Sequence, residues 1–470
     1  MPNRIFTLAD QIDFSMLSGD NNPLHVDPVA ARRTLFGKPV VHGIHALMWA
    51  LDQSLKNSTE FVRFQKLDVT FVKAIGLNEE IRLQLISEKN NRIRIDLFNN
   101  DELSVRAVCV LSTFKPNQRY EISPEKPILR PPELVDNESI RCRSGLLDMS
   151  LNPNLASQLF PNLTRHFCPL QSAILLGMSR LVGVECPGLQ SIFSELRLVE
   201  TNTGDLKGIK YHVAEFEDRY GLTLIAVSAP GLNGKITAFL RPVPQAQADY
   251  SIFKKLVKED EFAGQRALIV GGSRGLGEVA AKLLAAGGAD VQLTYHLGKD
   301  DAQKVTNDII SVGGHASNFS LDILQSKKDL VGAAVPTHLY YFASPIISGS
   351  GKSKFSPSLF KSYCDYYVNG FAEIVENLQR LGLRNVFYPS TVFINEMPPN
   401  FLEYVMVKNA GEVLCQGLAM KYPEMYFHCP RLPKMATDQT VSFTPSQNPT
   451  PAPIVLTALQ NFRNLTPQRL

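Results

Sequence analysis

A short polar stretch near the amino terminus, SGDNNPLH at residues 18–25, holds an aspartate and a histidine five positions apart. Gly, Asn and Pro surround Asp20 and His25, and a His-Gly pair follows at residues 42–43. A carboxylate and an imidazole on a short rigid segment can hold one water between them and move its proton. The same composition is also typical of a surface turn, because Gly, Asp, Asn and Pro favour turns for steric reasons.

One helix-length segment and several strand-like runs follow this stretch. GIHALMWALDQSL (43–55) predicts a helix, and strand-like runs follow it at 63–72, 80–88, 91–99 and 103–113. Runs such as RIRIDL alternate apolar and polar residues, which indicates strands with one buried face. We therefore predict an α+β domain over residues 1–120, in which one helix packs on an antiparallel sheet.

Residues 121–248 repeat this outline. The apolar segment CPLQSAILLGMSRLVG (168–183) predicts a helix, and strand-like runs follow at 191–200, 208–218, 220–230 and 235–242. The likeness is in pattern only, since the residues differ, and it indicates a structural duplication. Pro-rich stretches at 112–136 and 240–250 separate the units, because such composition resists helix and sheet.

The segment from FSMLSGDNNPLH to VHGIHAL resembles the MaoC-like (R)-specific enoyl-thioester hydratases and dehydratases, which have the hot-dog fold. The matching positions are Ser18, Gly19, Asp20, Asn22, Pro23, His25, Phe36, Gly37, His42 and Gly43. The resemblance implies that Asp20 and His25 are the catalytic pair and that Asn22 orients them. The Gly43 N–H is expected to stabilise the thioester oxygen, because a helix start presents unpaired donors.

The other histidines of these repeats have structural roles in our prediction. His42 fixes the turn before the helix, and His45 packs inside it. In the second repeat only His166 stands where the motif would lie, without an aspartate at the right offset. We therefore predict that the second repeat is non-catalytic and completes a double hot-dog.

A different pattern begins at about residue 261. RALIVGGSRGLGEVAAKLLAAGGADVQLTY (266–295) has the pattern of a buried strand, a glycine turn, a helix and a second strand. This predicts a doubly wound parallel α/β (Rossmann) domain over residues 261–470. The glycines permit a tight turn, so that a pyrophosphate can lie against backbone N–H groups at the helix start.

This loop and later motifs resemble the short-chain dehydrogenases/reductases of the 3-ketoacyl reductase type. YVMVK supplies Tyr404 and Lys408, which share one helix face at this spacing. The resemblance implies that Tyr404 passes a proton to the substrate carbonyl and that Lys408 lowers the pKa of the phenol. It also implies that Asn369 holds a water in the proton relay behind Lys408. The orienting hydroxyl belongs to Thr391, 13 residues before the tyrosine, or to Ser390.

The resemblance also implies a set of cofactor contacts, in which Asp322 meets the adenine. The expected residues are Gly271, Ser273, Arg274, Gly275, Leu276, Gly277, His296, Asp322, Ala343, Tyr404 and Lys408. No acidic residue ends the second strand to read the free ribose hydroxyl of NAD. Arg274 and His296 or Lys299 are instead expected to face a 2′-phosphate. We therefore expect NADPH, with NAD(H) as the alternative.

The third unit also departs from that family. FAS stands at residues 342–344 in place of N-A-G, Pro430-Arg431 stands in place of P-G, and no terminal D-G-G strand is visible. These changes do not touch the proton-transfer residues, but they bear on cofactor affinity.

Composition excludes several other functions. The chain has 470 residues, with 48 basic against 45 acidic ones, so charge indicates neither a nucleic-acid nor a membrane partner. The seven cysteines form no CxxC pair, which argues against a metal site and favours a reducing cytoplasm. The amino terminus has no apolar signal core.

The two implied activities share the (3R)-hydroxyacyl thioester as an intermediate. We therefore predict a bifunctional 3-ketoacyl-thioester reductase and (3R)-hydroxyacyl-thioester dehydratase, acting on CoA or acyl-carrier-protein substrates in fatty-acid or polyketide elongation. One alternative is a β-oxidation hydratase and NAD-dependent dehydrogenase. Another is an acyl-carrier docking scaffold with a decayed reductase site. A homodimer or larger homo-oligomer is expected.

Overall fold

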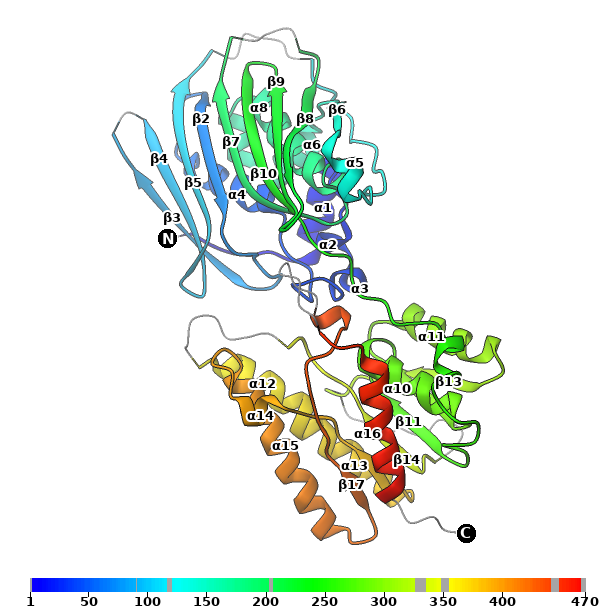
Figure 1. Cartoon of the computed structure of the whole chain (residues 1–470). Helices are drawn as coiled ribbons and strands as arrows, with labels where there is room; N and C mark the ends of the chain where they lie inside the picture. The colour runs from blue at the N-terminus through cyan, green and yellow to red at the C-terminus, as the bar shows by residue number, and fades with distance from the viewer. Residues whose placement is uncertain are drawn as a thin grey trace. The chain divides into compact units, whose positions relative to one another are not determined.

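A computed structural model describes residues 2–89, 91–115, 121–202, 206–325, 335–347, 355–440 and 448–465 (Figure 1). The chain forms two compact units, residues 1–243 and a second from residue 244 onward. Within the described ranges, no helix has the length and apolar character needed to cross a membrane.

An antiparallel sheet of ten strands forms the first unit, in the order β1-β3-β4-β5-β2-β7-β10-β9-β8-β6. The first five strands in the chain are β1 (Asn3–Ile5), β2 (Val62–Phe71), β3 (Glu80–Ser87), β4 (Arg92–Asn99) and β5 (Glu102–Thr113). The next five are β6 (Ser144–Leu147), β7 (Ser191–Glu200), β8 (Ile209–Glu217), β9 (Leu222–Ala229) and β10 (Leu232–Leu240). The strand runs predicted from alternating residues are all present.

The two halves of this sheet have the same strand order. Read from its outer edge, the first half is β1-β3-β4-β5-β2 and the second is β6-β8-β9-β10-β7. The innermost strands β2 and β7 join the halves, where residues 66–70 pair antiparallel with residues 195–199. The same connectivity on both sides is what duplication of one α+β repeat produces.

Each repeat packs one long helix along the sheet (Figure 1). The helices of the first repeat are α1 (Leu8–Ser18), α2 (Pro23–Val26), α3 (Pro28–Ala31) and α4 (Gly43–Ser54). Those of the second are α5 (Asn137–Arg141), α6 (Pro153–Leu159), α7 (Pro161–His166) and α8 (Pro169–Arg180), which continues into a π-helical turn at Leu181–Glu185. Helices α4 and α8 contact each other and are buried along most of their length. Their apolar character on every side reflects this burial.

The second unit contains a parallel sheet of six strands in the order β13-β12-β11-β14-β15-β17. These strands are β11 (Arg266–Val270), β12 (Asp290–Tyr295), β13 (His315–Ser320), β14 (His338–Tyr341), β15 (Asn385–Phe387) and β17 (Tyr426–His428). The order corresponds to 3-2-1-4-5-6 along the chain, which is the Rossmann arrangement. A separate parallel pair joins β16 (Ser390–Thr391) to β18 (Arg431–Leu432).

Helices cover both faces of this sheet. They are α9 (Tyr250–Phe253), α10 (Gly275–Ala286), α11 (Lys299–Ser311), α12 (Pro357–Cys364), α13 (Gly370–Arg380), α14 (Phe393–Glu396), α15 (Leu402–Lys421) and α16 (Pro451–Leu465). Ala267 and Ile269 of β11 belong to the apolar core that includes α10 and α16, whereas Leu268 and Val270 belong to the core that includes α13. Alternate strand residues therefore enter different cores, as a doubly wound sheet requires.

The second unit starts earlier than the predicted boundary at residue 261. Tyr250 and Phe253 of α9 and Val257 are buried in the same core as β11. The charged stretch before residue 261 is therefore part of the folded unit, because its apolar residues face inward.

Candidate active sites

Asp20 lies in the connection between α1 and α2, and His25 lies in α2. Gly19 ends α1 with a φ of 81°, a left-handed conformation that favours glycine. The Asn22 side chain caps α2 by accepting a hydrogen bond from Leu24 N at 3.0 Å. Asp20 and His25 are therefore held on either side of a capping residue.

The side chains of Asp20, His25 and His42 converge. One ligand-type atom of each residue lies within 4.8 Å of those of the other two. The imidazoles of His25 and His42 stack with their centroids 3.9 Å apart. Acidic and imidazole groups at this separation can exchange protons through a shared water or substrate.

Burial moves the pKa values of the two predicted catalytic groups in opposite directions. Asp20 is 3% exposed, and burial raises its pKa to about 7 against the opposing effect of two hydrogen bonds. Burial also lowers the pKa of His25 to about 4. Nδ1 of His25 lies 2.8 Å from the Val40 carbonyl oxygen, which only accepts, so the neutral ring keeps its lone pair on Nε2. The pair thus offers an acid and a base near neutral pH.

His42 and His45 connect α4 to α1. The His42 backbone N–H donates to Gln11 Oε1 at 3.0 Å, and its Nδ1 lies 2.9 Å from the same oxygen. Nε2 of His42 lies 3.0 Å from the Asp20 carbonyl oxygen. His45 stacks on Phe14 at a centroid distance of 4.6 Å. These contacts agree with the structural roles that we expect for both residues.

Gly43 begins α4, and no side chain caps that end of the helix. A Cβ atom at Gly43 would lie 2.7 Å from the Phe71 ring, so packing requires a glycine here. The N–H groups of a first helical turn have no partner within their helix. The Gly43 N–H is therefore a donor that an acyl oxygen can use.

The Asn22 side chain holds the segment against the second repeat. Its Nδ2 donates to Gly183 O at 2.8 Å and to the carbonyl oxygens of Gly188 and Leu189 at 3.3 Å each. Its backbone N–H donates to Asp20 Oδ1 at 3.3 Å. Asn22 therefore holds in place the segment that carries Asp20 and His25, through its backbone and through its side chain.

Two residues of the second repeat contact Asp20, and sequence reasoning missed both. Ser179 Oγ, on α8, donates to Asp20 Oδ2 at 2.7 Å. A Cβ atom at Gly183 would lie 2.1 Å from Asp20 Oδ1, so only glycine admits the carboxylate. Ser179 is 159 residues from Asp20, and no local pattern marks it. His166 ends α7 instead, with its buried Nδ1 unpaired within the described structure.

The glycine loop of the second unit connects β11 to α10. Gly271 has a φ of 84°, and a Cβ atom on it would lie 2.7 Å from Ala343 N. A Cβ atom on Gly277 would lie 2.2 Å from Gly271 O. Gly275 opens α10, and no side chain caps this helix. The tight turn and the uncapped helix start fit a pyrophosphate.

Three of the residues expected to contact the cofactor follow parallel strands of the sheet. His296 follows β12, Asp322 follows β13 and Ala343 follows β14. His296 Nδ1 lies 4.0 Å from Asp322 Oδ2. The structure therefore brings them to the carboxyl edge of the sheet, where open α/β sheets bind ligands. Ser273 is buried in the loop, and Leu276 packs against the core beside α10.

Arg274 pairs with a carboxylate of its own chain. Its Nη1 lies 2.5 Å from Oδ2 of Asp438, which is 5% exposed. Oδ1 of Asp438 also lies 3.8 Å from the Cβ position of Gly275. A buried carboxylate thus lies beside the start of α10. The expectation that Arg274 faces a 2′-phosphate does not hold in this arrangement, because Asp438 neutralises the guanidinium.

The structure distinguishes the two candidate hydroxyls near Tyr404. Burial raises the pKa of Tyr404, and a hydrogen bond with the Thr391 side chain opposes that rise. Ser390 Oγ instead donates to Glu412 Oε1 at 2.5 Å. Thr391 is therefore the hydroxyl beside the tyrosine.

Lys408 is held by a carbonyl and two aromatic rings. Its Nζ donates to Pro389 O and lies 4.4 Å and 4.3 Å from the ring centroids of Tyr367 and Tyr388. Burial lowers the pKa of Lys408 to about 7 and raises that of Tyr404. Both groups are desolvated and the ammonium is bound to a carbonyl, and Lys408 is not among the causes of the raised pKa of Tyr404. That Lys408, beside an oxidised nicotinamide, lowers the pKa of Tyr404 stays a prediction.

Asn369 also differs from its predicted role. It ends a π-helical turn at Asp365–Asn369 and is exposed. Its Nδ2 donates to Asp365 Oδ1 at 3.2 Å. The side chain therefore faces Asp365 instead of the proton relay behind Lys408. A π-helical turn inserts an extra residue, which changes the direction of the side chains that follow it.

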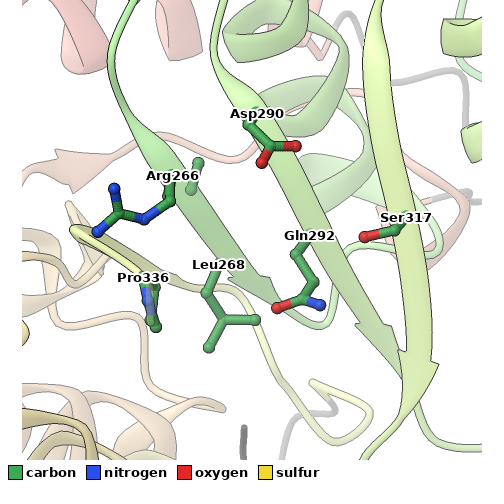
Figure 2. Close-up of a pocket in the computed structure, with 7 residues that line it drawn as sticks. Arg266, Leu268, Asp290, Gln292, Ser317 and Pro336 are labelled. Atoms are coloured by element: carbon green, nitrogen blue, oxygen red, sulfur yellow. The ribbon is translucent and has the colours of Figure 1, made fainter. Parts of the chain in front are cut away.

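A separate pocket lies on the sheet of the second unit, toward the amino ends of its strands. Figure 2 shows Arg266 and Leu268 on β11 and Asp290 and Gln292 on β12, with Ser317 of β13 beside them. The glycine loop lies at the opposite, carboxyl edge of this sheet. The pocket is therefore distinct from the expected cofactor crevice.

Comparison with known families identifies the first repeat. The family model described as "MaoC like domain" matches residues 2–106. A fatty acid synthase beta subunit of Emericella nidulans is 32% identical over 83 residues, which are 17% of this chain and 4% of that protein. Protein MaoC of Klebsiella aerogenes is 48% identical over 42 residues, 9% of this chain and 12% of that protein. The chain thus spans only a small part of either relative.

Solved structures of short-chain dehydrogenases are similar to the second unit. One from Burkholderia cenocepacia, in complex with NADP, is 21% identical and covers 44% of this chain and 95% of its own, with a TM-score of 0.40. One from Shigella flexneri is 20% identical and covers 44% of this chain and 88% of its own, with a TM-score of 0.40. The Rossmann assignment stands on the strand order itself. The chain therefore joins a stretch at residues 2–106 that matches the MaoC-like domain to a second unit with the Rossmann strand order.

Proposed function

We propose that the first unit is a hydro-lyase, which adds water to trans-2-enoyl thioesters and removes it from (3R)-hydroxyacyl thioesters. The observation that carries this proposal is the convergence of Asp20 and His25, with pKa values moved to about 7 and about 4. The MaoC-like match over these residues supports the substrate class. The two halves of the sheet are then the two repeats of a double hot-dog.

Each group of this site has a role in the proposed reaction. In hydration, Nε2 of His25 accepts a proton from water as the water oxygen bonds to C3 of the substrate. Asp20 then delivers its proton to C2, while the Gly43 N–H holds the thioester oxygen as negative charge gathers there. In dehydration the Asp20 carboxylate removes the C2 proton, and protonated His25 delivers a proton to the departing hydroxyl.

This assignment is tested by hydration of a short trans-2-enoyl-CoA, monitored through the loss of enoyl absorbance. We expect the wild-type protein to form the (3R)-hydroxyacyl product, and the Asp20→Asn and His25→Gln variants to fail. Unimpaired hydration by Asp20→Asn would show that this pair is not the acid–base machinery. Parallel assays with CoA and acyl-carrier-protein substrates identify the carrier.

We propose that the second unit reduces 3-ketoacyl thioesters with NADP(H), so that the two units share the (3R)-hydroxyacyl thioester. The residues fit the cofactor at its phosphate end, where Gly271–Gly277 form the tight turn and an uncapped helix begins. A bound nicotinamide supplies the hydride. The Tyr404 hydroxyl donates the proton to the substrate carbonyl oxygen, and Thr391 orients that carbonyl.

The test of this reductase is NADPH oxidation with an acetoacetyl thioester, followed by the appearance of enoyl absorbance. Reduction in the presence of NADPH, with little turnover of NADH, is the expected result. A large kinetic preference for NAD would favour the reverse, β-oxidation-type direction.

A second candidate function is favoured by the contacts of Lys408 and Arg274. Lys408 is bound to Pro389 O, and Arg274 is paired with buried Asp438. A Rossmann unit with both cations occupied in this way fits an acyl-carrier docking scaffold whose reductase site has decayed. Calorimetry that detects no binding of NADPH would favour the scaffold over the reductase. In either case we expect a homodimer or larger homo-oligomer.

A further inference from the structure

The second repeat lacks the Asp–His pair, yet its residues surround the pair of the first repeat. Three of its carbonyl oxygens hold Asn22, Gly183 makes room for Asp20, and the polar side chains of Ser179 and Arg241 lie beside the site. We propose that Ser179 and Arg241 are positioning residues that set the protonation of Asp20 and His25, respectively. This inference rests on the proposed hydro-lyase function.

Ser179 acts on the carboxyl group. It lies in the last turn of α8, is 3% exposed, and donates to Asp20 Oδ2 at 2.7 Å. A hydroxyl that donates to a carboxylate stabilises its charged form and lowers its pKa. Ser179 therefore opposes the effect of burial and keeps the pKa of Asp20 near neutral.

Arg241 acts on the imidazole through space. The residue directly follows β10 and is 4% exposed, and its Nη2 donates to Leu189 O at 2.7 Å. The same carbonyl oxygen accepts from Asn22 Nδ2 at 3.3 Å, so the guanidinium adjoins the catalytic segment. Its positive charge opposes protonation of His25 and contributes to the lowered pKa of that residue.

Arg241 is an unusual buried charge. Within the part of the chain that the structure describes, its Nε has no hydrogen-bond partner and no carboxylate forms an ion pair with it. Burial lowers its pKa to about 10, so it remains charged at neutral pH. Burying a charge without a counter-ion is costly, and such a group is retained where its field is used.

Other charged and titratable groups also face the pair. Nε2 of His42 lies 3.9 Å from Asp20 Oδ2, and the His42 ring stacks on His25. His45 lies in the first turn of α4, close enough to His42 to affect its charge, and an Arg180–Glu185 ion pair at 3.7 Å lies beside Gly19. None of these groups is substituted in the Ser179 and Arg241 variants, so each variant is designed to remove one contribution.

The pH dependence of enoyl-CoA hydration separates the two effects. The rate should fall at high pH as Asp20 loses its proton (the upper limb) and at low pH as His25 gains one (the lower limb). Ser179→Ala should move the upper limb to higher pH by about 0.5–1 pH unit. Arg241→Gln should move the lower limb, which belongs to His25, upward and leave the upper limb in place. Arg241→Lys keeps the charge and should restore the lower limb. Ser172→Ala, on the same helix, and Arg197→Gln, on the exposed side of β7, are matched controls that should move neither limb.

Lower activity with both limbs unmoved would reduce Ser179 and Arg241 to structural roles and overturn the proposal. A second readout does not depend on turnover: titration of the His25 imidazole by ¹⁵N NMR in the full-length wild-type and Arg241→Gln proteins, with His25→Gln as the assignment control. An upward shift in Arg241→Gln supports the electrostatic role even if no hydration is detected, a result that would count against the proposed function alone. An unchanged titration overturns the role of Arg241.

Discussion

Desolvation has opposite consequences at the two candidate sites. In the first unit, burial raises the pKa of Asp20 and lowers that of His25, which produces an acid and a base near neutral pH. In the second unit, burial raises the pKa of Tyr404, so the phenol is a weaker acid. Burial also lowers the pKa of Lys408, so a smaller fraction of that side chain is protonated at neutral pH. Correct residue types at the correct spacing therefore do not by themselves set the ionisation that catalysis needs.

The origin of the difference lies in the neighbours of each site. Asp20 and His25 have partners that balance burial: the Ser179 hydroxyl supports the carboxylate, and the Val40 carbonyl fixes the imidazole tautomer. The Lys408 ammonium instead donates a hydrogen bond to the Pro389 carbonyl and lies over two aromatic rings. Five measurements test this difference between the two sites.

Loss of the acid–base pair should have the largest effect. Asp20→Asn and His25→Gln should each lower the rate of hydration by about 10²–10⁴-fold, because each removes one proton-transfer group. NADPH oxidation by the same variants should stay at the wild-type rate, since that chemistry belongs to the other unit. Steady-state assays of both activities measure this, and an equal fall in the two would indicate general unfolding.

The second unit has a matched pair of hydroxyls. Tyr404→Phe should lower 3-ketoacyl reduction by about 10²-fold or more, because it removes the proton donor. Thr391→Val should cost more activity than Ser390→Ala, since Thr391 contacts Tyr404 and Ser390 faces Glu412. Steady-state rates with an acetoacetyl thioester decide this, and the reverse order would reassign the hydroxyl to Ser390.

The hydration rate should depend on pH as a bell. The active pair carries one proton, which Asp20 loses as the pH rises through about 7, while His25 gains a second proton as the pH falls through about 4. We expect limbs near these two values in kcat/KM, measured from pH 3.5 to 9 with a stability control at each end. A profile that is flat across pH 6–8 would contradict the raised pKa of Asp20.

Asp438 offers a test of the phosphate end of the second unit. Asp438→Asn should tighten NADPH binding by several-fold, because it frees Arg274 and removes a negative charge beside the start of α10. Arg274→Gln should weaken the binding of NADPH and NADH to a similar extent, because it leaves the Asp438 charge unpaired beside the start of α10. Calorimetry with both nucleotides measures these changes, and equal affinities in Asp438→Asn and wild type would show that the ion pair does not oppose binding.

The smallest effect is expected in the second repeat. His166→Gln should change the hydration rate by less than about two-fold, because His166 ends α7 away from the reacting groups and its buried Nδ1 has no hydrogen-bond partner to lose within the described structure. The same assay measures it. A large loss would mean that the second repeat has a working site of its own.

The sequence alone determined the local elements of this protein. Periodicity predicted α4, α8 and the long strands of both repeats, because a buried face imposes its pattern on the residues themselves. The glycine loop and the helix that bears Tyr404 and Lys408 were equally predictable, since steric limits and helical spacing act over a few residues.

Only the tertiary structure decided how these elements work together. It placed Ser179 and Arg241 beside a pair from the other repeat, separated Thr391 from Ser390, and turned Asn369 toward Asp365. It also pairs Arg274 with Asp438, which lies 164 residues away in the sequence. These outcomes depend on contacts between distant segments and on the burial that those contacts create, and neither is written in the local pattern of residues.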